Sequence, residues 1–232
     1  MNNPNPTAII TGGTGALGSV VVQSFLEAGM NVAVPVHSAK SISQRENNER
    51  FLTIETDLIV ELKVQLFVEQ VQEKFGSVNY LVNLAGGYAG GNTIAQVSLE
   101  EWESMMSLNL KTTFLMCREV LKVMMAAKFG SIVNIAAMPA LLSGVKKGPY
   151  AISKRAVISL TETIADEVKG SGITVNAIAP SIILTEANKA SMPSADFQKW
   201  VTPEEITNLI LFLCSDKSRS INGNAIKIFG GV

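Results

Sequence analysis

The chain is 232 residues long, and 47% of these residues are hydrophobic while 17% are charged. That length and composition suffice for one large core, and no stretch resembles a linker, so we expect residues 1–232 to form a single domain. Nineteen basic and twenty acidic side chains give a net charge of −1. No run of like charge is longer than the pair Lys146 and Lys147, so the sequence indicates no basic patch for nucleic acid or an anionic membrane, and a small molecule is the expected partner.

The cysteines and the lack of a targeting or membrane-spanning pattern indicate the cellular compartment of the protein. Cys117 and Cys214 lie in segments of helical pattern and have no metal-ligand spacing, so we expect reduced core cysteines and no metal site. The opening MNNPNP has no basic region followed by an apolar run, and no segment approaches the roughly 18 unbroken apolar residues of a membrane span. The sequence therefore predicts a cytoplasmic protein without a membrane-spanning segment.

Short β-branched or apolar runs alternate along the chain with longer segments of helical period, which is typical of βαβ units. Seven strands are expected, at residues 7–10, 31–36, 51–55, 80–84, 131–135, 174–178 and 225–229. Helices are expected to begin near Ala16, Ser43, Ile59, Leu99, Tyr150 and Pro203, and the one near Ser43 is the weakest. The sequence thus predicts an α/β fold: a single Rossmann-type, doubly wound, seven-stranded parallel sheet with helices on both faces.

Residues 181–201 break this alternation. The segment has no strand pattern and carries Met192, Phe197 and Trp200 among mostly polar residues. A loop of that length in a compact domain is usually functional, which favours a substrate loop here. The alternative is that the three apolar side chains simply attach a surface segment to the core.

A glycine-rich turn follows the first expected strand. In Thr11-Gly-Gly-Thr-Gly-Ala-Leu-Gly18, the residues Gly13, Gly15 and Gly18 satisfy GxGxxG. Glycines let the backbone turn tightly and approach a pyrophosphate, and the helix that follows offers free N–H groups and a partial positive charge. A strand before the motif and a helix after it are the context in which it indicates a dinucleotide site.

The end of the second expected strand bears on the choice of dinucleotide. An acidic residue there would accept the adenosine ribose hydroxyls and repel a 2′-phosphate. None is present in Val34-Pro-Val-His-Ser-Ala-Lys40, and His37, Ser38 and Lys40 can donate to a phosphate. This favours NADPH, with NADH as the alternative, although His37 fits equally well as an exposed loop residue without a role.

Tyr150 and Lys154 open a helix at the i, i+4 spacing that places two side chains on one face, one turn apart. A tyrosine has an ordinary pKa near 10, so acid–base work around neutral pH requires a nearby cation that favours the phenolate. Lys154 can supply that charge. The alternative is a helix with one buried aromatic residue and one solvated lysine.

The order of several motifs distinguishes these two readings. It runs from the glycine-rich turn through Asp57, Asn83-Leu-Ala-Gly86, Asn109, Tyr150 and Lys154 to Pro180. In that order the chain resembles the short-chain dehydrogenase/reductase family over essentially its whole length. The resemblance implies hydride transfer from a bound nicotinamide.

The resemblance also implies a role for each site residue. Tyr150 would protonate the substrate, Lys154 would bind the nicotinamide ribose while lowering the tyrosine pKa, and Asn109 would interrupt its helix to hold a proton-relay water. The implied cofactor-binding residues are Gly12, Thr14, Gly15, Ala16, Leu17, Gly18, His37, Ser38, Asp57, Leu58, Ala85, Gly86, Lys154, Pro180, Ile183 and Thr185.

The chain departs from the family pattern at a catalytic position. Small departures are Ala16, Leu84 and Ser181, where the family usually carries glycine, asparagine and glycine. The serious one is Ala137, which stands thirteen residues before Tyr150 where the family carries its catalytic serine. The hydroxyl that would orient a substrate carbonyl is missing there.

A closer resemblance accounts for that alanine. Segments 12–19, 85–92 and 191–200 resemble the dihydropteridine reductase branch, which also has alanine at this position. The implied substrate is a quinonoid dihydropterin, a flat conjugated imine that stacking can hold, with Tyr88 and Trp200 as the expected walls. Against this, the branch usually carries an acidic residue after its second strand, and this chain does not.

Two other functions stay open. A carbonyl or 3-oxoacyl reductase would use Ser143 or a water in place of the missing hydroxyl at Ala137, and a non-catalytic dinucleotide-binding protein would have lost activity altogether. Apolar helical faces over 105–125 and 151–164 suggest, by resemblance, a homodimer or homotetramer packed through those helices. Extra core volume is the alternative explanation for both faces.

Overall fold

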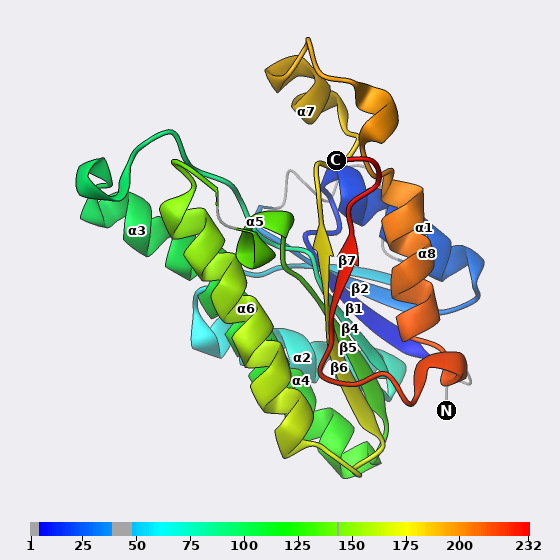
Figure 1. Ribbon diagram of the computed structural model, residues 1–232. Helices are drawn as coiled ribbons and strands as arrows, with labels where there is room; N and C mark the ends of the chain where they lie inside the picture. The colour runs from blue at the N-terminus through cyan, green and yellow to red at the C-terminus, as the bar shows by residue number, and fades with distance from the viewer. Residues whose placement is uncertain (1–4, 39–47, 143) are drawn as a thin grey trace.

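A computed structural model describes residues 5–38, 48–142 and 144–232, and its centre is a parallel sheet (Figure 1). The strands are β1 (Thr7–Thr11), β2 (Asn31–Val36), β3 (Phe51–Glu55), β4 (Tyr80–Asn83), β5 (Gly130–Ile135), β6 (Ile173–Pro180) and β7 (Ala225–Ile228). Their order across the sheet is β3-β2-β1-β4-β5-β6-β7, and every neighbouring pair is parallel. The predicted seven-stranded, Rossmann-type sheet is confirmed.

Helices cover both faces of the sheet, as Figure 1 shows. The long helices are α1 (Ala16–Glu27), α2 (Glu61–Phe75), α4 (Thr112–Ala127), α6 (Gly148–Glu167) and α8 (Pro203–Leu213). Alternate strand residues face opposite sides, so Ile9 packs in the core layer that holds α2 and α4, while Ile10 packs in the layer that holds α1 and α8. Buried apolar side chains cover both faces of the sheet, which is why most strand segments are nearly continuous apolar runs.

The single helix predicted from Leu99 is three consecutive pieces. Helix α3 (Leu99–Met105) runs into the π-helical segment η3 (Met106–Lys111), and α4 follows without a break. The shorter elements are α5 (Met138–Leu141), α7 (Glu186–Ser191) and the 3-10 turns η2 (Ile94–Gln96), η4 (Phe197–Lys199) and η5 (Asp216–Ser218). The helix predicted near Ser43 begins outside the described residues.

Segment 181–201 is partly regular, contrary to the prediction of an irregular loop. It contains α7, whose start is capped by Thr185, and a parallel bridge joins Ile183 to Val201. Trp200 is only 6% exposed and its ring lies 4.8 Å from that of Phe197. Phe197 and Trp200 therefore anchor the segment, as the alternative expects, whereas Met192 lines the cleft described below.

The strand order changes direction between β1 and β4, and this is the place where doubly wound sheets bind ligands, at the carboxyl ends of the strands. The hydroxyl of Thr11 at the end of β1 accepts hydrogen bonds from the backbone N–H groups of Leu84 and Ala85, at 3.1 and 3.0 Å. The loop after β4 is thereby held beside the glycine-rich turn after β1. Both loops border the cleft described below.

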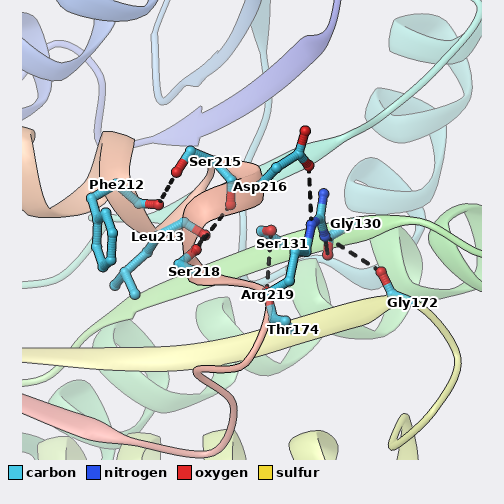
Figure 2. Close-up of polar contacts among 10 residues, drawn as sticks. All are labelled: Gly130, Ser131, Gly172, Thr174, Phe212, Leu213, Ser215, Asp216, Ser218 and Arg219. Atoms are coloured by element: carbon cyan, nitrogen blue, oxygen red, sulfur yellow. Dashed lines mark hydrogen bonds and ion pairs between the residues drawn. The ribbon is translucent and has the colours of Figure 1, made fainter.

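At the opposite end of the sheet, where the strands begin, Arg219 links several segments, as Figure 2 shows. Its guanidinium donates to the carbonyl oxygens of Gly130, where β5 begins, and Gly172, just before β6, at 3.3 and 3.4 Å. It also donates to Asp216 at 3.3 Å and lies over the ring of Phe129, 4.1 Å from its centroid. One side chain thus ties the amino ends of two central strands to η5.

We predict that Arg219→Lys lowers the free energy of unfolding by about 1–2 kcal/mol, because a lysine keeps the charge but cannot donate along several directions from one plane. Urea titration followed by circular dichroism measures this change. The cleft lies at the other edge of the sheet, so dinucleotide affinity should stay within about twofold of the wild-type value, which corresponds to less than about 0.5 kcal/mol. An unchanged urea midpoint would show that the contacts of Arg219 contribute nothing to stability.

Among the described residues, no helix is long and apolar enough to cross a membrane, and no group of three His, Cys, Asp or Glu side chains is arranged to hold a metal ion. Cys117 and Cys214 are buried and unpaired, as predicted.

Candidate active site

A cleft of about 710 Å³ opens at the carboxyl edge of the sheet. Six segments border it: the glycine-rich turn, the loop after β4, the end of β5 with α5, the start of α6, the end of β6 and α7. The lining residues are 12, 15–18, 84, 86–88, 135–139, 147, 150, 154, 180–183, 188, 191 and 192. Segments far apart in the sequence therefore meet at one site.

The glycine-rich turn leaves room for a phosphate group. Gly12 has φ +67°, and a Cβ there would lie 2.9 Å from the backbone nitrogen of Ala85. A Cβ on Gly18 would lie 2.0 Å from the carbonyl oxygen of Gly12, so only glycine permits this close packing. Gly15 is the N-cap of α1 and supplies no side-chain cap, so the first N–H groups of the helix face the cleft free to bind an anion. These residues fit a dinucleotide pyrophosphate.

We predict that Gly15→Ala weakens dinucleotide binding tenfold to a hundredfold, or about 1–3 kcal/mol, because the new methyl group occupies space that a phosphate needs. The backbone of Gly15 is extended at φ −77°, and its nearest neighbour to an added Cβ is the Gly12 oxygen at 3.3 Å. The fold should therefore tolerate the alanine with only a small adjustment. Fluorescence titration with NADPH and a thermal melt measure the two effects, and unchanged affinity would remove the phosphate from this turn.

Lys154 lies at the floor of the cleft. The side chain is only 6% exposed, and its ammonium donates to the carbonyl oxygen of Ile135 at 2.8 Å. The ammonium also lies beside Gly86, where a Cβ would be 3.1 Å away. Burial lowers the pKa of Lys154 to about 8. The alternative of a solvated lysine is wrong, since this cation is held inside the protein.

Tyr150 lies one helical turn before Lys154 and also lines the cleft. Its ring packs edge-on against the ring of Tyr88, with centroids 5.0 Å apart and planes at 81°. Burial, and to a lesser degree the phenol of Tyr88, raises the pKa of Tyr150 to about 12. This is opposite to the predicted lowering by Lys154, because the ammonium donates to a backbone carbonyl and burial opposes the phenolate.

Asn109 is in the π-helical segment η3, so the interruption expected at this residue is present. Its amide nitrogen donates to the oxygens of Gly87 and Ser153, at 3.1 and 3.0 Å, and its side-chain oxygen accepts from the Gly87 N–H at 2.9 Å. The wider turn aims this fully buried side chain at the loop after β4. Asn109 therefore joins that loop to α6, and its predicted water relay stays a prediction.

Ala137 presents only a methyl group to the cleft. It is the N-cap of α5 and lies next to Met138 at the end of β5. Among nearby hydroxyls, Ser181 donates to the Phe229 carbonyl and Ser153 donates to the Tyr150 carbonyl. Both are committed to the backbone, and Ser143 is outside the described residues.

The structure brings most of the predicted residues together, but not all of them. Those at the cleft are Gly12, Gly15, Ala16, Leu17, Gly18, Gly86, Tyr88, Ala137, Tyr150, Lys154, Pro180 and Ile183. Those not among its lining residues are Thr14, His37, Ser38, Asp57, Leu58, Ala85, Asn109, Thr185 and Trp200. For Trp200 the reason is its burial against Phe197, so the expected ring-stacking wall is not at the cleft.

Other residues of this second group have local roles in the fold. His37 is exposed where β2 ends, and Asp57 accepts from the N–H of Ile59 at 3.2 Å. Leu58 packs against the core beside α2, and Thr185 caps α7. Lys40 is outside the described residues.

The cleft also contains residues that the sequence reasoning did not single out, chiefly Lys147 and Asn188. A usable signal existed for Lys147, because it stands three residues before Tyr150 and so shares a helical face with it. Asn188 gave no such signal, since it lies in the segment read as irregular.

Comparisons with known proteins agree with this geometry. Residues 6–196 match the short chain dehydrogenase family. The 3-oxoacyl-[acyl-carrier-protein] reductase FabG of Staphylococcus epidermidis is 28% identical, over 98% of this chain and 99% of the relative. The NAD-dependent glycerol dehydrogenase of Listeria innocua is 30% identical, over 99% of this chain and 94% of the relative.

Solved structures give the same result. The structure of ElxO with NADP bound superposes with a TM-score of 0.91 at 26% identity, covering 98% of each chain. Levodione reductase superposes with a TM-score of 0.89 at 26% identity, covering 97% of this chain and 96% of the other. This chain therefore belongs to the short-chain dehydrogenase/reductase family of NAD(P)-dependent oxidoreductases.

Proposed function

We propose that this protein is an NADPH-dependent carbonyl reductase. One observation carries the proposal: Tyr150, whose pKa is raised to about 12, and the buried cation Lys154 lie at the floor of a cleft that begins at the free N-terminus of α1. A phenol that keeps its proton at neutral pH is an acid rather than a base. In this form Tyr150 can act as the general acid of a carbonyl reduction, which is the reaction that we propose.

The dinucleotide would extend from α1 to α6. The uncapped start of α1 would hold the pyrophosphate, Lys154 would donate to the nicotinamide ribose, and Pro180 with Ile183 would cover the nicotinamide. When bound, the reduced nicotinamide supplies a hydride. Gly86 lets the ammonium of Lys154 and the amide of Asn109 approach the backbone of this loop, since a Cβ would lie 3.1 and 2.6 Å from them.

Tyr150 would complete the reduction by protonating the substrate. As the carbonyl carbon takes up a hydride, its oxygen acquires charge, and the phenol donates a proton to that oxygen. Lys154 would assist by holding the cofactor, since its ammonium donates to the Ile135 carbonyl and is not among the groups that shift the pKa of Tyr150. The edge-on ring of Tyr88 limits where a substrate can approach the phenol.

The preference for NADPH rests on the end of β2. No carboxylate follows Val36 directly, where an acid would repel a 2′-phosphate, and the next residue is the exposed His37. The similar solved structure of ElxO contains NADP, while the glycerol dehydrogenase relative is named as NAD-dependent. NADH is thus the alternative, which a paired titration decides.

The substrate class rests on the relatives and on the cleft. Relatives that act on 3-oxoacyl groups and on polyols share nearly the whole chain, which supports a carbonyl compound. A second candidate, the quinonoid dihydropterin, is favoured by Ala137 together with Tyr88 at the cleft. Because Trp200 is buried elsewhere, a flat ring would have one stacking wall instead of two, so we rank this candidate second.

Assembly and compartment belong to the same proposal. Exposed apolar side chains on α4 and α6, among them Phe114, Met125 and Ile152, are 41%, 48% and 43% accessible. Faces of this kind are suited to pairing with a second copy, which supports a homodimer or homotetramer. Two unpaired cysteines fit a reducing compartment, which supports the cytoplasm.

The proposed function is tested by following nicotinamide absorbance with NADPH and a panel that contains a 3-oxoacyl thioester, simple ketones and a quinonoid dihydropterin. Decay with the carbonyl compounds supports the proposal, and decay with the dihydropterin alone supports the second candidate. Tight NADPH binding without decay for any acceptor would leave a non-catalytic dinucleotide-binding protein.

Ala137→Ser tests the missing hydroxyl directly. We predict that it raises kcat/KM for simple ketones about tenfold, because one added donor to the carbonyl oxygen is worth about 1–2 kcal/mol. Ala137 is only 5% exposed in the protein but lines the cleft, so the hydroxyl is near the reacting atoms. Ala140→Ser, a buried alanine three residues later that is not among the cleft-lining residues, is the matched control. Equal rates for the wild type and Ala137→Ser would show that another group already orients the carbonyl.

A further inference from the structure

Lys147 borders the cleft, and the role given to it here rests on the proposed reductase function. Lys147 is the N-cap residue just before α6, followed by Tyr150 three positions later and Lys154 four positions after that. This spacing places the three side chains on one face of the helix. All three line the cleft. The cleft is therefore bordered by two lysines, and one of them, Lys147, has no part in the mechanism above.

The charge of the cleft is one-sided. Of the residues that line it, Lys147 and Lys154 are the basic ones, and no aspartate or glutamate is among them in the described parts of the chain. The ammonium of Lys154 already donates a hydrogen bond to the Ile135 carbonyl oxygen. Lys147 is half-buried, and the ion pairs found in the described residues do not include it.

The backbone around Lys147 is fixed. The carbonyl oxygen of Lys147 accepts the Ala151 N–H at 2.8 Å, which closes the first turn of α6. The neighbouring carbonyl of Lys146 accepts the Gly91 N–H, also at 2.8 Å, and so ties this turn to the loop after β4. The first turn of α6 contains no acidic residue and no side-chain cap, so the partial positive charge of the helix start adds to that of Lys147.

We propose that Lys147 binds an anionic group of the substrate, so that this reductase acts on carbonyl compounds that also carry a carboxylate or a phosphate. Lys147 and Tyr150 are about 5 Å apart along the helix, one turn. The anion would therefore sit one or two carbons from the carbonyl. Such an anchor holds the carbonyl oxygen against the Tyr150 phenol, which is what the missing hydroxyl at Ala137 would otherwise do.

The test compares matched pairs of charged and uncharged substrates. The probes are acetoacetate with its methyl ester, and dihydroxyacetone phosphate with dihydroxyacetone. The variants are Lys147→Gln and Lys147→Glu, and the matched control is Lys146→Gln, which alters the adjacent lysine outside the cleft lining. The measured quantity is kcat/KM with NADPH held at saturation.

We expect the wild type and Lys146→Gln to prefer one anion over its uncharged partner at least tenfold, and the pair that shows this identifies carboxylate or phosphate. Lys147→Gln should lose at least tenfold on the anion while the uncharged partner changes less than twofold, and Lys147→Glu should reverse the preference. Equal losses of Lys147→Gln on both members of each pair, or wild-type indifference to charge, would overturn the proposal.

A binding measurement separates this proposal from the proposed function. Malonate and dimethyl malonate cannot be reduced, so calorimetric titration of the NADPH-loaded protein needs no turnover. Malonate binding that is lost in Lys147→Gln supports an anion site even if no acceptor is reduced, in which case only the reductase function fails. Malonate binding that is equal in the wild type and in Lys147→Gln overturns the anion site.

Discussion

Tyr150→Phe is expected to lower kcat for NADPH-dependent reduction about a thousandfold, the size of effect that a positioned general acid contributes. Only the phenol hydroxyl is removed, since phenylalanine keeps the ring that packs edge-on against Tyr88, with ring centroids 5.0 Å apart. The fold and the affinity for NADPH should therefore stay as they are. Stopped-flow decay of nicotinamide absorbance gives the rate, and fluorescence titration gives the affinity.

The matched control is Tyr88→Phe, which removes the hydroxyl of the neighbouring tyrosine and keeps its ring. Because the phenol of Tyr88 contributes to raising the pKa of Tyr150, its removal should lower that pKa and change the rate far less than Tyr150→Phe does. A Tyr88→Phe variant as inactive as Tyr150→Phe would mean that the proton comes from Tyr88, and the assignment of the acid would move to that residue.

Lys154→Met is expected to abolish turnover and yet stabilise the protein at pH 7. Burial lowers the pKa of Lys154 to about 8, from 10.5 in the unfolded chain. Below pH 8 the lysine is charged in both states, so the folded state carries the full cost of a buried cation. Methionine removes that cost and gives up one hydrogen bond to Ile135, for a net gain of about 1–3 kcal/mol.

The lowered pKa of Lys154 also predicts how the stability of the protein changes with pH. Between about pH 8 and 10.5 the unfolded chain holds a proton on this lysine that the folded chain has lost, so the wild type gains stability as the pH rises through that window. Lys154→Met lacks this gain, and the difference between the two proteins should shrink toward pH 10.5. Urea titrations at pH 7 and 10 measure it, and a variant less stable than the wild type at pH 7 would show that Lys154 supports the fold.

The parts of the fold set by burial on both faces could be predicted from the sequence. All seven strands were, and for most of them this is the reason: a strand such as Asn31–Val36 is buried at every position and its sequence is almost entirely apolar, whereas β7 is only partly buried. Tyr150 and Lys154 were paired for an equally local reason, since four residues span one helical turn. The glycine-rich turn was recognisable because Gly12 and Gly18 have no room for a Cβ.

Features set by distant neighbours could not be predicted from local patterns. The π-helical turn at Met106–Lys111 interrupts no apolar pattern, and only the family resemblance at Asn109 indicated it; Asn109 there contacts the distant Gly87 and Ser153. The burial of Trp200 depends on Phe197 and on the bridge to residue 183. The direction of the Tyr150 pKa shift depends on burial, which the spacing to Lys154 does not show.

The central claim, that this cleft transfers a hydride to a carbonyl, is tested most directly by NADPH deuterated at C4. The substrate is the carbonyl compound that the panel identifies as fastest, and mass spectrometry measures deuterium in the alcohol product for each of the two C4 epimers. We predict that one epimer places deuterium on the product carbon and the other places none, because a cofactor held by α1 and Lys154 presents one face. Product without deuterium from either epimer would contradict hydride transfer at this site.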